Sequence, residues 1–358
     1  MEKTNKRITS FELLRVISII MIVSYHYYVH GILHGFSTVS VIQEASGLNR
    51  GFALFLSPGG SVGVGIFFSI TGYFVSKGKG LLSLKKTVIK VYVYGWLTIM
   101  SALAFNWFTD GIFFKEFQTE ELIESLIGLI FVPFSSKMWW FATAYVLLIM
   151  LAPWLNAHLE HLSVKKMFVV VFMLLFFEYV LGRMVSPLFN YQTAVFFYLV
   201  GALLRKIHDL KIRGGGRLCW MLIVLFSWAI CAFSNYYTLI RDQFFVRKFA
   251  EGISLVSSAV CVFFIVYMTI DIKLKKHKMI NYLSASIFGV YLLHDSLFSR
   301  VIIWDYLIKA GEHYLSKTFI PYCIGSVLII FILSIFIDKI IDKFVLKTIF
   351  KYFWREKA

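Results

Sequence analysis

Ten apolar runs of nearly bilayer-spanning length divide almost the whole chain. They lie at residues 10–33, 61–76, 87–108, 138–156, 166–182, 191–205, 218–238, 250–271, 286–308 and 319–341. A helix needs about 20 mainly apolar residues to cross the hydrocarbon core of a bilayer, and the shorter runs reach this length with flanking aromatic, Lys and Arg side chains. We therefore predict an all-α, polytopic membrane bundle of about ten transmembrane helices. A shorter run at 122–134 is expected to be interfacial or re-entrant.

The distribution of positive charge supports this division. The chain has 36 Lys and Arg against 20 Asp and Glu, a net charge of +16, which in a soluble protein would indicate nucleic acid binding. However, 59% of the residues are apolar and 16% are charged, which excludes an ordinary soluble composition. When the ten runs alternate across a membrane, 25 of the 36 cations fall on one side and nine on the other. The positive-inside rule then predicts that both termini are cytoplasmic, and no nucleic acid partner is expected.

The first apolar run contains ionisable residues, which are costly within a membrane and therefore candidates for function. Eleven residues separate Arg15 from His26, so their side chains share one helix face, ~16 Å apart along the axis. Glu12 precedes Arg15 by three residues and is close enough to pair with it. The alternative is that Glu12 and Arg15 form an interfacial ion pair and that His26 is a hydrogen-bonded core residue.

Other polar or aromatic residues in the apolar runs are further candidates for function. Glu178 lies inside the fifth run, His294 and Asp295 lie in the middle of the ninth, and Trp140 lies at the predicted outer boundary beside Trp139. The alternatives are a structural or protonated acid at Glu178, a buried polar cluster at His294 and Asp295, and interfacial belt residues for the tryptophans. The short HxxH pattern at 158–161 offers too few ligands, so no metal site is expected.

Five segments, in order along the chain, together resemble the acyltransferase-3 family of integral-membrane acyltransferases. The first has a basic residue, an acidic residue, Arg and, eleven positions later, His, which here are Arg7, Glu12, Arg15 and His26. The other four are GGSVGVGIFFSITGYFVSKG, WWFATAYVLLIMLAPWLN, FFYLVGALLRK and SIFGVYLLHDS. Each motif is weak alone, but five in order with this number of spans are specific. The resemblance covers most of the chain, which we expect to form a single domain over residues 1–358 without a fused extracytoplasmic domain.

The resemblance implies transfer of an acyl group, usually acetyl, from cytoplasmic acyl-CoA to a hydroxyl of an extracytoplasmic or lipid-linked cell-envelope glycan. His26 would be the general base, and Arg15, with Glu12 beside it, would support donor binding or form part of a polar track through the membrane. The candidates for binding the acceptor are Glu178, His294, Asp295 and Trp140. Arg15, the Thr71 hydroxyl and backbone N–H groups near Gly72 would be donors to the oxyanion. For Thr71 and Gly72 the alternative is close packing of helices by small residues. The implied location is the cell membrane, among lipid, with acyl-CoA as a substrate and no cofactor.

The second predicted cytoplasmic loop departs from the family pattern. Many members have an arginine-rich motif there, whereas this chain has Lys85, Lys86 and Lys90. Lysines attract the phosphates of coenzyme A as point charges but without bidentate geometry. They are candidates for donor binding, with positive-inside topology charges as the alternative.

The rival class of function is a transporter or exporter of a glycan or small solute. Such a protein would move its substrate along the same polar residues inside the membrane, and it needs no acyl donor. If the chain is an acyltransferase, we expect Arg15 and His26 to lie on one cavity inside the bundle. Were both to face lipid, or to lie on opposite sides of the bundle, the mechanism would fail.

Overall fold

The computed structural model describes residues 8–34, 39–77, 84–134, 136–177, 189–212, 214–241 and 243–353, and in these ranges the chain forms helices, turns and short loops without a strand. The predicted all-α class is confirmed. The longer helices are α1 (Thr9–His26), α3 (Gly47–Leu56), α4 (Gly59–Val75), α5 (Leu84–Phe108), α7 (Thr119–Phe131), α8 (Ser136–Glu160), α9 (Val164–Phe177), α11 (Phe189–Asp209), α12 (Arg217–Ile240), α13 (Phe244–Ile270), α15 (Ile287–His294) and α18 (Phe319–Ile341). The shorter helical segments are η1 (Tyr27–Ile32), α2 (Val41–Glu44), α6 (Ile112–Lys115), α14 (Lys278–Ser284), α16 (Leu297–Val301), η4 (Ile302–Leu307), α17 (Ala310–Tyr314), η5 (Asp342–Leu346) and α19 (Lys347–Phe353).

Seven helical units of the described residues are long and apolar enough to cross a membrane, or eight if a bent pair counts as one span. The protein is therefore a multi-pass membrane protein, with fewer qualifying spans than the ten predicted. The two predicted spans that fall short are helical as well. One is α9, of which 14 residues are described, and the other is α11, whose first turn includes the polar Asn190 and Gln192.

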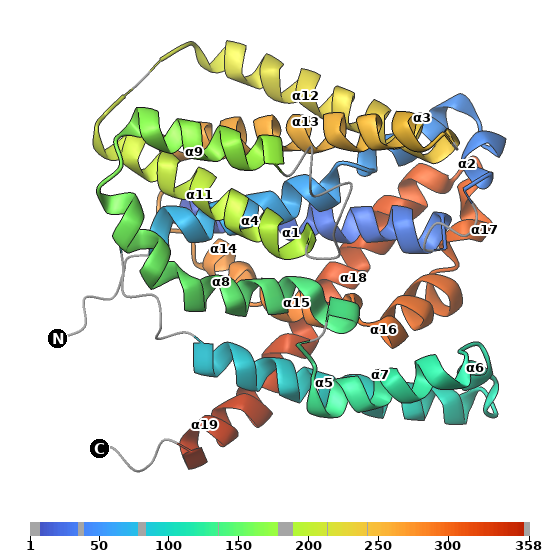
Figure 1. Cartoon of the computed structure of the whole chain (residues 1–358). Coiled ribbons are helices and arrows are strands. Elements are labelled where there is room, and N and C mark those ends of the chain that lie inside the picture. Colours follow the sequence, from blue (N-terminus) through green and yellow to red (C-terminus); the bar gives the residue numbers. More distant parts are fainter. Residues whose placement is uncertain are drawn as a thin grey trace.

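Helix α4 lies at the centre of the bundle, between α1 and α11 (Figure 1). The unit Gly47–Val75, which includes α4, is the most buried candidate span at 78%, and α12 is the least buried at 22%. Glycines let α4 approach its neighbours, because a Cβ on Gly59 would lie 2.6 Å from the Met21 carbonyl oxygen of α1. On the opposite face, a Cβ on Gly72 would collide with the carbonyl of Tyr198 in α11. Small residues that allow close backbone approach are typical of helix packing in lipid.

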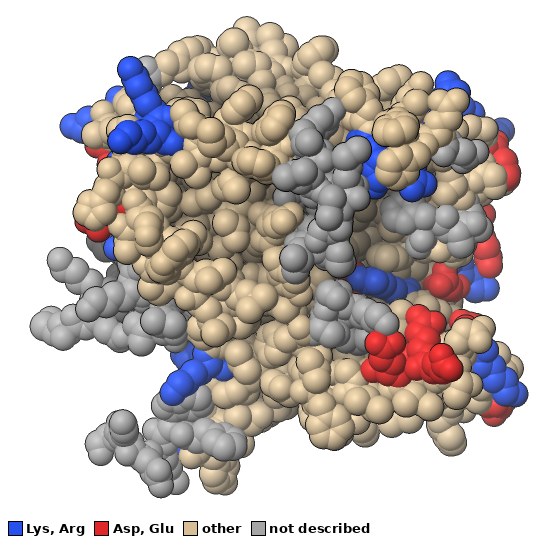
Figure 2. Space-filling model, viewed as in Figure 1, with Lys and Arg blue, Asp and Glu red and all other residues tan. Residues whose placement is uncertain are grey.

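Side-chain contacts gather loops from distant parts of the sequence at the two ends of the bundle. At one end His34 pairs with Asp305 at 3.0 Å, and the Tyr314 hydroxyl donates to the Ile42 carbonyl. At the other end Asp209 pairs with both Lys77 and Arg205. If successive apolar runs cross the membrane in alternating directions, these are the segments that should lie at the same end. Which end is cytoplasmic stays a prediction. Charged side chains lie mainly toward these two ends, with a broad uncharged band between them (Figure 2).

The short run predicted to be re-entrant forms α7, which lies alongside α5 (Figure 1). The Tyr92 hydroxyl donates to the Phe131 carbonyl at 3.2 Å, and a Cβ on Gly95 would lie 2.6 Å from the Leu129 carbonyl oxygen. Helix α7 therefore ends near the middle of α5, and α8 starts from that level instead of from the end of the bundle.

The ninth predicted span is broken, which corrects the expectation of a continuous helix over 286–308. The units Lys278–His294 and Leu297–Leu307 meet at an angle of 87°. Ser296 caps the second unit by accepting a hydrogen bond from the backbone N–H of Ser299 at 3.1 Å. Asp295 has non-helical backbone angles at the break. Non-helical backbone at membrane depth is tolerated where it is buried in protein or lines a cavity, and Asp295 does line a cavity, described next.

Candidate active site

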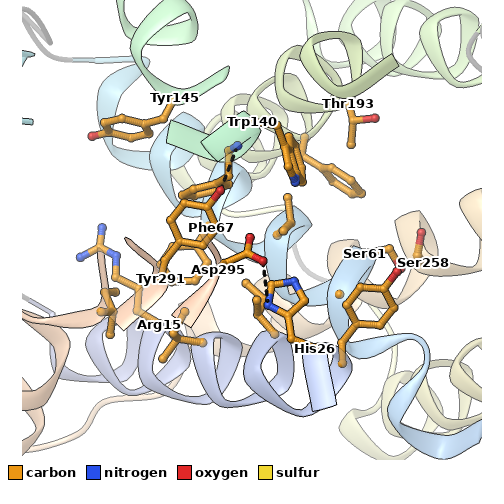
Figure 3. Close-up of a pocket in the computed structure, with 18 of the residues that line it drawn as sticks. Arg15, His26, Ser61, Phe67, Trp140, Tyr145, Thr193, Ser258, Tyr291 and Asp295 are labelled. Atoms are coloured by element: carbon orange, nitrogen blue, oxygen red, sulfur yellow. Dashed lines mark hydrogen bonds and ion pairs between the residues drawn. The ribbon is translucent and has the colours of Figure 1, made fainter. Parts of the chain in front are cut away.

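One elongated cavity of about 790 Å³ passes between α1, α4, α8, α12, α13 and α15. Arg15 and His26 of α1 both line it, which confirms the expected shared cavity. In Figure 3 His26 points from α1 toward Asp295, Arg15 lies to one side, and Ser61 and Ser258 lie to the other. Trp140 lies across the cavity from His26, and Phe67 also lines the cavity.

The imidazole of His26 is 8% exposed and sits in a buried polar cluster built by the broken helix. Its Nδ1 lies 2.9 Å from Nε2 of His294 and 3.4 Å from Oδ1 of Asp295. The Nε of Arg300 donates to the same Oδ1 at 2.8 Å, and Nε2 of His30 lies 4.0 Å from it. The carboxylate is 1% exposed, and its charge is balanced by the guanidinium.

The hydrogen bonds of this cluster determine where the proton of a neutral His26 resides. The Nδ1 of His294 lies 2.6 Å from the carbonyl oxygen of Val290, which only accepts, so a neutral His294 has its proton on Nδ1. Its Nε2 then accepts from Nδ1–H of His26, and Oδ1 of Asp295 is a second acceptor for that proton. This assignment rests on the hydrogen-bond network. It leaves Nε2 of His26 unprotonated and able to take a proton from a substrate.

We divide the lining of this single cavity into two parts, one on each side of His26. The Arg15 chamber is lined by Glu12, Arg15, Thr71, Thr87, Tyr145 and Ser284, and the Asn235 chamber by Ser57, Ser61, Asn235, Thr238, Glu251 and Ser254. A Cβ on Gly60 would meet the ring of Tyr25, which places the adjacent Ser61 at the level of His26. Thr71 lies ten residues further along α4, or ~15 Å away, at the level of Arg15.

A family model described as an acyltransferase domain, that of the acyltransferase-3 family, matches residues 8–339. The chain belongs to the acyltransferase-3 family. No curated protein and no solved structure matches the chain. The match covers nearly the whole chain and includes both chambers of the cavity, which supports a membrane acyltransferase.

In this acyltransferase Arg15 and Glu12 pair as predicted, with Nη1 of Arg15 2.7 Å from Oε1 of Glu12. The Glu12 side chain is 6% exposed and that of Arg15 is 28% exposed. Helix α1 is continuous from Thr9 to His26, so the two functional candidates remain ~16 Å apart along its axis. Arg15 is therefore too far from His26 to stabilise charge on an atom that reacts at the imidazole, although it can bind a more distant part of a long substrate.

Thr71 and Gly72 have different positions relative to the cavity. Thr71 lines the Arg15 chamber, and its hydroxyl donates to the Phe67 carbonyl of its own helix at 2.9 Å. Gly72 is buried against Tyr198 of α11, on the far side of α4. This geometry favours the helix-packing alternative for Gly72 over an oxyanion role.

The three lysines of α5 divide into two groups. Lys85 and Lys86 are exposed at the start of the helix, where phosphates could reach them. Nζ of Lys90 is 2.5 Å from Oδ1 of Asp338 in α18, and the Tyr94 hydroxyl donates to the same oxygen at 2.5 Å. Because the Asp338 side chain is 2% exposed, the pair of Lys90 and Asp338 has a clear structural role that the sequence analysis did not foresee.

His294 and Asp295 contact His26 directly, and Asp295 also lines the cavity. They were predicted as acceptor-binding residues with a buried polar cluster as the alternative, and their contacts with His26 favour that alternative. Trp140 lines the cavity as well, and Trp139 is fully buried, so neither is a belt residue at the end of the bundle. Both tryptophans lie inside the bundle because α8 begins near the middle of α5, where α7 ends. Glu178 lies outside the described residues.

The cluster contains side chains that can bind a metal ion, since the potential ligand atoms of His26, His30 and Asp295 lie within 4.8 Å of one another. Arg300 already contributes the positive charge at Asp295, at 2.8 Å from Oδ1. A divalent ion would add a second charge beside this guanidinium, so the described arrangement fits an imidazole cluster better than a metal centre.

Several residues of the site were missed by the sequence analysis. Tyr291 lines the cavity, and its hydroxyl oxygen accepts a hydrogen bond from the backbone N–H of Phe141 at 3.4 Å. Asn235 and Ser254 line the Asn235 chamber, and the Ser254 hydroxyl donates to Oδ1 of Asn235 at 2.6 Å. An asparagine within the apolar run 218–238 was a usable signal for this chamber.

Proposed function

We propose that this acyltransferase moves an acyl group, acetyl by preference, from cytoplasmic acyl-CoA to a hydroxyl of an extracytoplasmic or lipid-linked cell-envelope glycan in the cell membrane. The observation that supports this most directly is the cluster around His26. It holds a neutral imidazole with Nε2 free to accept a proton, at the point where two chambers of one cavity meet. A donor and an acceptor that enter from opposite ends would meet at this atom.

In the proposed reaction Nε2 of His26 removes the proton of the acceptor hydroxyl while its oxygen attacks the thioester carbonyl. A C–O bond forms, the C–S bond then breaks, and the thiolate takes the proton back from the imidazolium. The products are the ester and free coenzyme A. His294 and Asp295 accept the Nδ1 proton throughout, and Asp295 stabilises the positive charge that His26 acquires.

The oxyanion of the tetrahedral intermediate needs donors near His26. The Tyr291 hydroxyl accepts from Phe141, so its own proton remains available to a substrate. The indole N–H of Trp140, on the cavity wall opposite α1, is a second donor. Arg15 lies at the donor end, where we propose that it binds the polar arm of coenzyme A. Lys85 and Lys86 would attract the phosphates outside the cavity.

The test is the release of free thiol from acetyl-CoA by purified protein in the presence of glycan acceptors, together with mass spectrometry of the envelope glycans of cells with and without the protein. We expect His26→Ala to lower the rate by 10²–10⁴-fold at equal membrane abundance, because it removes the general base. A near-normal rate in this variant would place the chemistry elsewhere. If thiol release did not depend on His26 with any hydroxyl acceptor, the proposed activity would be wrong.

A further inference from the structure

The Asn235 chamber has an unusually polar wall for the interior of a membrane bundle. Ser61 of α4 is exposed to it, and Asn235, Thr238, Glu251 and Ser254 are half-buried along it. Polar groups inside a membrane bundle are costly unless they are paired or serve a substrate. Their number on one wall, next to His26, points to a polar ligand.

Three hydroxyl groups on this wall already donate their protons within the protein. Ser61 donates to the Pro58 carbonyl at 3.2 Å, and Thr238 donates to the Ser234 carbonyl at 2.9 Å. Ser254 donates to Oδ1 of Asn235 at 2.6 Å. A hydroxyl that donates to the backbone or to an amide retains its lone pairs. The wall therefore presents mainly hydrogen-bond acceptors to whatever occupies the chamber.

The charge of the chamber leads to the same conclusion. Glu251 lines it, and the carboxylate pairs with Lys248 at 3.0 Å, with Arg247 3.9 Å away. Neither Lys248 nor Arg247 lines the cavity, so it is the carboxylate, a hydrogen-bond acceptor, that faces a ligand in the chamber. An anionic ligand would meet lone pairs and a carboxylate here, whereas a neutral ligand rich in hydroxyl groups would find a partner for several of its protons.

We propose that the Asn235 chamber is the acceptor subsite, and that it binds a neutral polyhydroxylated group, such as an uncharged sugar ring, by accepting hydrogen bonds from its hydroxyls at Ser61, Thr238, Ser254 and Glu251. This inference rests on the proposed function. It adds the residues that hold the acceptor and the charge class of the sugar. One hydroxyl of a ring held there would lie beside His26, because Ser61 is at the same level of the bundle.

Binding without chemistry is the first test. In detergent, and without acyl-CoA, the methyl glycosides of glucose, galactose and N-acetylglucosamine should raise the thermal unfolding temperature, and the methyl glycoside of glucuronic acid should do so less. Ser61→Ala and Thr238→Val should weaken the stabilising effect. Thr269→Val is the matched control, because Thr269 also donates to its own helix, at 2.8 Å from the Ile265 carbonyl, but it does not line the cavity. Equal responses in all variants, or a preference for the anionic sugar, would overturn the subsite.

Steady-state kinetics with acetyl-CoA and the best of these glycosides separate the subsite from the activity. We expect Ser61→Ala and Thr238→Val each to raise the acceptor KM about three- to ten-fold, as the loss of one hydrogen bond predicts, with the acetyl-CoA KM unchanged. A rise in the acetyl-CoA KM instead would assign the chamber to the donor and refute the inference while leaving acyl transfer intact. Glycoside binding that depends on Ser61 and Thr238, without His26-dependent thiol release, would refute the activity and leave a sugar site.

Discussion

At the scale of single residues, the reactivity of His26 depends on the groups that hold its Nδ1 proton. The pair with His294 spans 268 positions of the sequence, and the Val290 carbonyl sets the tautomer of His294 at 2.6 Å. Neutral imidazoles that act as bases commonly need such a partner to orient the ring and keep the reactive nitrogen unprotonated. His294 is thus a positioning residue in the proposed mechanism.

Substitutions of His294 should separate positioning from folding. In His294→Gln the amide oxygen can still accept the Nδ1 proton, so we expect a loss in kcat of about ten-fold or less. In His294→Leu that acceptor is absent, and we expect a loss of about 10²-fold, with a changed pH profile of kcat. Rates and thermal unfolding would be measured for both variants. Identical losses in the two, with a pH profile like that of the native protein, would show that His294 has only a packing role.

At the scale of elements, close contacts between helices hold together the bundle that surrounds the cavity. Gly72 permits contact between α4 and α11, and Asp338 links α18 to Lys90 and Tyr94 of α5. Neither feature touches the reacting groups. Both should therefore affect stability more than catalysis.

Gly72→Ala tests the contact between α4 and α11. The added methyl group would collide with the Tyr198 carbonyl, and overpacking of this kind costs about 1–3 kcal/mol. Gly325→Ala in α18 is the control, because a Cβ there meets nothing within 4 Å, so the better helix propensity of Ala should leave stability equal or higher. Thermal unfolding in detergent measures both. If Gly72→Ala were as stable as Gly325→Ala, the described packing of α4 on α11 would be wrong.

The lysines of α5 offer a comparison between donor binding and structure. We expect Lys90→Met to lower the free energy of unfolding by about 3 kcal/mol, because it leaves the buried Asp338 without its cation, and to leave the acyl-CoA KM unchanged. The double variant Lys85→Gln, Lys86→Gln should instead raise the acyl-CoA KM, by a factor that shrinks in high salt. If only the Lys90 substitution raised the acyl-CoA KM, Lys90 and not Lys85 or Lys86 would be the residue that binds the phosphates.

At the scale of the whole molecule, the orientation in the membrane decides which chamber meets which substrate. The end that includes His34, Asp305 and Tyr314 is predicted to be extracytoplasmic, and the end with Asp209 is predicted to be cytoplasmic. The Asn235 chamber lies toward the first end and the Arg15 chamber toward the second. The donor and acceptor assignments require this orientation.

Cysteine labelling tests the orientation. In a background without the four native cysteines, single cysteines would replace Glu312, whose side chain is 69% exposed at the first end, and Lys276, which is exposed at the second. A membrane-impermeant maleimide should label Glu312→Cys in intact cells and Lys276→Cys only after permeabilisation. The opposite labelling pattern would show that the protein has the reverse orientation in the membrane, and the donor and acceptor assignments of the two chambers would then be wrong.

The sequence alone was sufficient for the features that depend on local pattern. Apolar runs predicted the helices, because the cost of exposing backbone and polar groups to lipid acts within each segment. The placement of Arg15 and His26 on one face followed from helical periodicity, and both residues do line one cavity. The motifs of the first run and four others led to the family that the domain match confirms.

The tertiary structure decided which distant residues meet. The 87° break at Asp295 brings His294 onto His26, and the half-length α7 lowers Trp140 to the cavity. Lys90 pairs with the buried Asp338, which is 248 positions away in the sequence. Hydropathy and periodicity assign a residue to a helix face but do not specify its neighbour, because helices in lipid associate through the detailed fit of their surfaces and through hydrogen bonds between helices.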